Sequence, residues 1–103
     1  MDAEWILCAA IHLDDGEKYP HQSVSTGLVF CGHRHPAIIA QLAAVYGDRA
    51  ARAADGMREA QGFLTSKGRF VNRQEAYEIA VTFGQVTPGE TVRPAALDSS
   101  DLY

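Results

Sequence analysis

Residues 62–76, GFLTSKGRFVNRQEA, decide the fold of this chain because they combine a hairpin with a helix start. Two short apolar runs flank the turn residues 66–68, in which Gly68 can supply the positive φ that a short hairpin loop needs. Asn72 stands at the position of a helix N-cap, and Glu75 follows at capping-box spacing. We therefore predict two antiparallel strands that lead directly into a capped helix.

The same segment gathers aromatic and polar side chains around one helix N-terminus: Phe63, Thr65, Arg69, Asn72 and Arg73. Free N–H groups and a partial positive charge at a helix N-terminus favour an anion such as phosphate. The alternative interpretation is a plain hairpin-to-helix junction, in which the asparagine is only a cap and the phenylalanine only packs in the core.

The rest of the chain interleaves strands with helices. Residues 5–13, WILCAAIHL, are nearly all apolar and predict a strand covered on both faces, one of them by a partner subunit. Residues 27–31 predict a second strand, while Pro36 is a natural first helical residue and Gly47 a natural stop. The pattern predicts an α+β fold with a small antiparallel sheet, a β-hairpin and two to three helices, in an oligomer.

A chain of 103 residues predicts a single domain, 1–103. Residues 48–60 are rich in Ala and Arg and have a thin apolar stripe, so we expect a short solvated helix or a surface insertion there. Residues 85–103 are expected to form an irregular C-terminal tail because their prolines interrupt regular structure. Four apolar residues in the tail could pack back onto the domain: Val92, Leu97, Leu102 and Tyr103.

Charge and composition restrict the class of partner. The net charge of −4 argues against a DNA or RNA polymer but is compatible with a small anion held by local arginines. The first residues have no basic region and too short an apolar run for a signal peptide or a membrane span, so we expect no membrane partner and a cytoplasmic location. Cys8 and Cys31 are expected to be reduced thiols.

Residues 31–35, CGHRH, form the second dense cluster of chemistry-bearing side chains. Arg34 could hold a phosphate bidentately, with His35 adding a hydrogen bond. The alternative is an arginine that pairs with a surface carboxylate. Cys31, His33 and His35 could bind zinc or serve a phosphodiesterase or a metal-dependent nucleotide hydrolase. Since no second metal motif and no catalytic motif accompany them, we predict no metal, no cofactor and no enzymatic activity.

Together these elements resemble a phage family, the Thoeris anti-defence proteins of the first type. The resemblance spans most of the chain, although residues 48–60 have no counterpart. It is carried by an early CAAI-like strand, G-H-R-H at 32–35, Q-G-F at 61–63, G-R-F-V-N-R-Q-E-A at 68–76 and D-L-Y at 101–103.

The resemblance implies a small sponge that binds cyclic ADP-ribose signals, such as glycocyclic ADP-ribose, in the cytoplasm of the host bacterium without cleaving them. It also implies a homo-dimer or homo-hexamer, and for some members a second site for cyclic oligonucleotides. Carried over residue by residue, Arg34 and Arg93 would hold the pyrophosphate, and Phe63 would stack on the adenine. Asn72 and Thr65 would bond the ribose or the base. A nucleotide hydrolase and a non-catalytic protein-interaction module remain alternatives.

Overall fold

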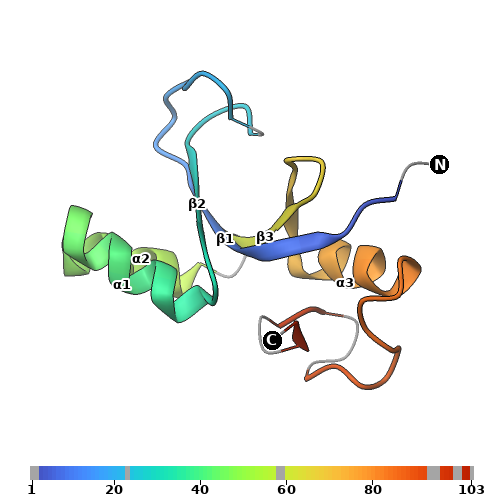
Figure 1. Ribbon diagram of the computed structural model, residues 1–103. Coiled ribbons are helices and arrows are strands. Elements are labelled where there is room, and N and C mark those ends of the chain that lie inside the picture. The colour runs from blue at the N-terminus through green and yellow to red at the C-terminus, as the bar shows by residue number, and fades with distance from the viewer. Residues whose placement is uncertain (1–2, 23, 58–59, 93–95, 99–100, 103) are drawn as a thin grey trace.

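The computed structural model describes residues 3–22, 24–57, 60–92, 96–98 and 101–102. Four strands form one antiparallel sheet in the order β2-β1-β3-β4, shown in Figure 1. The strands are β1 (Ile6–Leu13), β2 (Leu28–Gly32), β3 (Gln61–Thr65) and β4 (Phe70–Asn72). The helices are α1 (His35–Tyr46), α2 (Asp48–Gly56) and α3 (Arg73–Thr82). The predicted α+β class, with its antiparallel sheet, hairpin and helices, is confirmed.

The hairpin and the helix start have the predicted local geometry. Gly68 has a φ of 77° in the turn between β3 and β4, and its N–H donates to the carbonyl of Thr65. The side-chain oxygen of Asn72 accepts from the N–H of Glu75 at 2.8 Å, and the Glu75 carboxylate accepts from the N–H of Asn72 at 3.1 Å. This reciprocal capping box lets α3 begin directly after β4.

The helices cover one face of the sheet. α1 contacts β1 and β2, whereas α3 contacts β1, β3 and β4. Their apolar side chains meet those of the strands in a single core, with Ile11, Phe63 and Leu42 almost fully buried at its centre. Within the described ranges, no helix is both long and apolar enough to cross a membrane.

β1 lies inside the sheet and carries an irregularity near its start. The register shifts between Ile6 and Cys8, which breaks the strict alternation of buried and exposed side chains. The amide of Gln85, just after α3, accepts from the N–H of Ile6 at 2.6 Å and donates to its carbonyl at 3.0 Å. Trp5 and Leu7 are each 47% exposed in the single chain, so the covering of this face by a partner subunit stays a prediction.

Two segments outside the sheet also contribute to the core. The short helix that we expected within residues 48–60 is present as α2, and most of its residues are exposed. It packs on α1, and two of its residues, Ala51 and Ala54, are buried in the core. Leu97 in the C-terminal segment is fully buried, and its N–H donates to the carbonyl of Arg73 at 3.0 Å. The tail thus packs back against the start of α3.

A buried carboxylate joins the N-terminal segment to the hairpin. Glu4 is 6% exposed, accepts two hydrogen bonds from the guanidinium of Arg69 at 2.9 and 2.7 Å, and accepts a third from the hydroxyl of Thr65 at 2.7 Å. The bonds from Arg69, followed by the bond from Thr65, lower the pKa of Glu4 from 4.5 to about 2. The carboxylate is therefore ionised in the folded protein at neutral pH.

We expect Glu4→Gln to lower the free energy of unfolding at pH 7 by about 1 kcal/mol, because Arg69 is half exposed and water screens the pair. A depressed pKa in the folded state stabilises the fold above the unfolded pKa, and this stabilisation is lost as the pH falls toward the folded value. The difference between wild type and variant should therefore shrink from about pH 4.5 to about pH 2. Thermal unfolding across this range measures it, and a constant difference would contradict the network.

Candidate functional site

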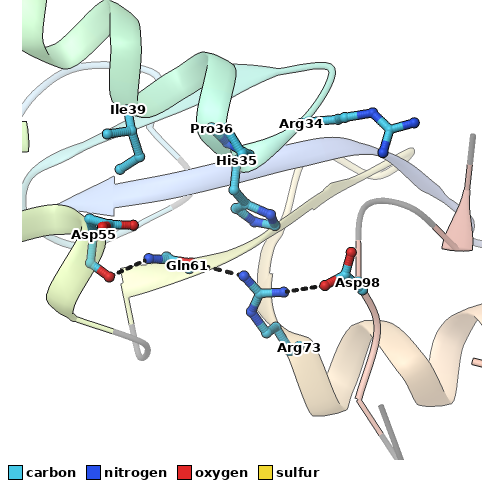
Figure 2. Close-up of a pocket in the computed structure, with 8 residues that line it drawn as sticks. All are labelled: Arg34, His35, Pro36, Ile39, Asp55, Gln61, Arg73 and Asp98. Atoms are coloured by element: carbon cyan, nitrogen blue, oxygen red, sulfur yellow. Dashed lines mark hydrogen bonds and ion pairs between the residues drawn. The ribbon is translucent and has the colours of Figure 1, made fainter. Parts of the chain in front are cut away.

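A pocket of about 500 Å³ lies where the start of α1, the end of α2, the start of β3 and the start of α3 converge (Figure 2). The C-terminal segment closes part of its rim through Asp98. The titratable groups of the lining are two arginines, two aspartates and one histidine. The lining residues are Arg34, His35, Pro36, Ile39, Asp55, Gln61, Arg73 and Asp98.

Gln61, the first residue of β3, connects the elements that form the pocket. Its amide nitrogen donates to the carbonyls of Ala54 and Asp55 at 3.2 and 2.9 Å, and so binds the C-terminal end of α2. Its amide oxygen accepts from Nη2 of Arg73 at 2.8 Å. One side chain thereby fixes α2 relative to the first residue of α3, as the dashed lines in Figure 2 show.

Arg73 is held in place from two sides. Besides its bond to Gln61, it donates from Nη1 to the carbonyl of Leu97 at 3.3 Å, and Nη1 lies 3.9 Å from a carboxylate oxygen of Asp98. Its side chain is still 21% exposed. Arg73 is therefore an anchored and partly exposed guanidinium in the lining of the pocket.

Arg34 reaches the same pocket from the start of α1 and is held less firmly. It is the N-cap residue, with an extended backbone (φ −140°, ψ 155°), and its side chain makes no capping bond. The guanidinium has no hydrogen-bond or ion-pair partner among the residues that the structure describes. The predicted alternative, in which Arg34 pairs with a surface carboxylate, therefore finds no support in the described part of the chain.

His35 is the most buried titratable group of the pocket, with 5% of its surface exposed. Its Nε2 lies 2.8 Å from the carbonyl oxygen of Gly62, and its ring meets the ring of Phe63 edge-on at a centroid distance of 5.2 Å. Burial lowers the pKa of His35, an effect that the positive charge of Arg73 increases. The imidazole is therefore neutral at neutral pH.

The structure brings together only part of the predicted ligand-binding set. Arg34 and His35 line the pocket, and Arg93 lies outside the described residues. Phe63 is fully buried in the core, so its ring has no face open to an adenine. Thr65 is also fully buried, and its hydroxyl donates to Glu4. We therefore assign structural roles to Phe63 and Thr65 in place of the predicted ligand contacts.

Several lining residues escaped the sequence-based prediction. The sequence pattern places Arg73 at the helix N-terminus without predicting a ligand contact for it, and it predicts no site role for Asp55, Gln61 or Asp98. Gln61 stands in the Q-G-F motif, which is the one local feature that could have identified it. The two aspartates lie in segments whose position depends on tertiary packing.

The cluster proposed for metal binding or hydrolysis does not assemble around one point. His35 turns toward Gly62, whereas Cys31 pairs in the sheet with Ala10 and its thiol interacts with that of Cys8. Burial, and then the neighbouring Cys8, raise the pKa of Cys31 to about 11, so it is a neutral thiol at neutral pH. In the described part of the chain, no three His, Cys, Asp or Glu side chains form a group that could hold a metal ion.

Asn72 does not line the pocket, and its side chain serves the capping box. We expect Asn72→Ala to lower the free energy of unfolding by about 1 kcal/mol and to leave ligand affinity unchanged, whereas Asn72→Asp should retain the cap. Chemical denaturation and calorimetric titration measure the two effects separately. A folded Asn72→Ala protein with weakened binding would restore Asn72 as a ligand contact.

Comparison with known proteins places the chain in a family. The family model described as "Phage T4 y16D protein" matches residues 5–103. A search of curated proteins found no match, and a search of solved structures found none either. Since the family model covers almost the whole chain, this protein belongs to the phage T4 y16D protein family.

Proposed function

We propose that this protein is a phage sponge that binds and sequesters a cyclic ADP-ribose-type nucleotide, such as glycocyclic ADP-ribose, in the cytoplasm of the infected bacterium. The observation that carries this proposal is the presence of two guanidinium groups, Arg34 and Arg73, in one pocket of about 500 Å³. The motifs shared with the Thoeris anti-defence proteins and the membership of a phage family support it.

The lining complements such a nucleotide chemically. Guanidinium groups bind phosphate oxygens with parallel hydrogen bonds, and Arg34 is available because no described residue pairs with it. Asp55 and Asp98 offer acceptors for ribose hydroxyls or for an adenine amino group. A ligand with both anionic and hydroxyl-rich parts therefore fits this pocket better than a bare anion. The pocket volume lies in the range of roughly 300–1,000 Å³ that is typical of small-molecule sites.

We propose binding without cleavage, because holding a signal below the level that its receptor senses requires affinity and no nucleophile. The hydrolase alternative relied on Cys31, His33 and His35. The raised pKa of Cys31 removes its thiolate at neutral pH, and His35 is engaged with Gly62. These two findings favour a sponge over that hydrolase.

We further propose that the working unit is a homo-oligomer, a dimer or a hexamer. Sequestration of a signal takes roughly nanomolar affinity, near −12 kcal/mol, which usually requires stacking of the base as well as phosphate contacts. None of the eight lining residues in the described part of the chain is Phe, Tyr or Trp. A second copy placed against the open side of the pocket would supply the missing aromatic ring.

Calorimetric titration of the wild-type protein with cyclic ADP-ribose isomers tests the proposal. We expect heat release at micromolar protein concentration, and recovery of the ligand with unchanged mass after the complex is denatured. Absence of heat with every isomer would refute the sponge function. Time-dependent loss of the nucleotide would favour the hydrolase instead. Native mass spectrometry of the same complex gives the subunit count.

A further inference from the structure

We propose that His35 selects the ligand by accepting a hydrogen bond, through its Nδ1 atom, from a hydroxyl or amino group that lies next to the bound phosphate. The inference rests on the proposed function, because it concerns the same pocket. It adds a specificity that two arginines cannot provide, since guanidinium groups recognise any phosphate-like anion that fits their donors.

The first step is the position of the imidazole proton. Nε2 lies 2.8 Å from the carbonyl oxygen of Gly62, and a carbonyl oxygen can only accept a hydrogen bond. Nε2 must therefore carry the proton. Because burial keeps the ring neutral at neutral pH, the other ring nitrogen, Nδ1, has a free lone pair and acts as an acceptor.

The second step concerns the surroundings of Nδ1. This atom has no hydrogen-bond partner among the described residues. In the same part of the chain, no side-chain nitrogen or oxygen of a non-exposed residue is both completely buried and unpaired. Nδ1 must therefore retain some contact with solvent. Since His35 lines the pocket and only 5% of its surface is exposed, we infer that this contact opens into the pocket.

The third step is the fixed orientation of the ring. The bond to Gly62 and the edge-on contact with Phe63 hold the imidazole between the start of α1 and β3. Figure 2 shows the ring pointing from α1 toward Gln61 and Arg73. A rigid acceptor in a pocket that is also lined by Arg34 and Arg73 favours a ligand that carries a hydrogen-bond donor as well as a phosphate. An anion without such a donor would displace water from Nδ1 without replacing its hydrogen bond, and this would lower the affinity of that anion.

His35→Gln provides the test, because the glutamine amide can keep donating to the Gly62 carbonyl but has no acceptor at the position of Nδ1. We expect its affinity for cyclic ADP-ribose to fall about 3- to 10-fold, the usual effect of losing one neutral hydrogen bond. Its affinity for symmetric dimethyl pyrophosphate, which has the diphosphate but no hydroxyl or amino donor, should be unchanged. His35→Asn is the matched control, since its side-chain oxygen replaces Nδ1 while the Gly62 bond is lost. It should bind the nucleotide more tightly than His35→Gln does and unfold more easily than the wild type.

A spectroscopic measurement separates ligand contact from a merely structural role. The ¹⁵N resonance of Nδ1 in the wild-type protein should move upfield when cyclic ADP-ribose binds and stay in place with dimethyl pyrophosphate. An unchanged resonance with the nucleotide, or equal losses of affinity for both ligands in His35→Gln, would overturn the role of His35 while the sponge function stands. If the wild-type protein binds neither cyclic ADP-ribose nor dimethyl pyrophosphate, both proposals are refuted.

Discussion

Replacement of Gly62 by alanine is expected to destabilise this protein severely. A Cβ atom at Gly62 would clash with the carbonyl oxygen of Val71 in the neighbouring strand and would lie 2.9 Å from Cζ of Phe70. The strand cannot yield, because β4 pairs with β3 here and leads directly into α3. Overpacking typically costs about 1–3 kcal/mol, and we expect more than 3 kcal/mol where the clash is with backbone. That is a large share of the roughly 5–15 kcal/mol that stabilises a domain.

Two other glycines serve as controls. At Gly32 a Cβ atom would lie 2.8 Å from Cγ1 of Ile38, which is a side-chain atom and can move, so Gly32→Ala should cost about 1–3 kcal/mol. At Gly56 a Cβ atom would meet nothing within 4 Å, and Gly56→Ala should be neutral or slightly stabilising. Urea denaturation followed by circular dichroism ranks the three. A Gly62→Ala protein with wild-type stability would mean that β3 and β4 are spaced more widely than described.

Local sequence patterns predicted the hairpin and its helix because the determining contacts are short-range. The positive φ of Gly68 and the Asn72–Glu75 capping box both depend on residues within a few positions of each other. The role of Gly62 depends on the close approach of a second strand, and the burial of Ala51 depends on how α2 packs. Spacing along the chain contains no information about either contact.

The candidate site was only partly predictable for a related reason. Gln61, Phe63 and Thr65 alternate along β3 and are all buried, which places them on the face that the helices cover. Only Gln61, at the start of the strand, reaches the pocket, whereas Phe63 is buried in the core and Thr65 bonds Glu4 beside the hairpin turn. A hairpin model alone cannot distinguish these positions, because the distinction depends on where α2 ends.

We expect Arg34→Ala to lower the affinity for cyclic ADP-ribose about 10- to 100-fold, because a charge-assisted hydrogen bond to phosphate contributes roughly 1.5–3 kcal/mol. The free energy of unfolding should change by less than about 0.5 kcal/mol, since the side chain makes no cap bond and has no partner among the described residues. Titration calorimetry at fixed salt and chemical denaturation measure the two effects. Arg34→Lys should bind with intermediate affinity, because lysine keeps the charge but loses the planar fork.

Arg34 distinguishes binding from folding better than the second guanidinium of the pocket does. Substitution of Arg73 would break its bonds to Gln61 and Leu97, so a loss of affinity there could follow from a disturbed fold. Arg49→Ala, at an exposed position of α2 outside the pocket lining, makes the same change of net charge and should bind like the wild type. Equal losses in the Arg34 and Arg49 variants would mean that net charge alone attracts the nucleotide. Wild-type affinity in Arg34→Ala would mean that the nucleotide binds elsewhere, because no other described group could replace an unpaired guanidinium at the start of α1.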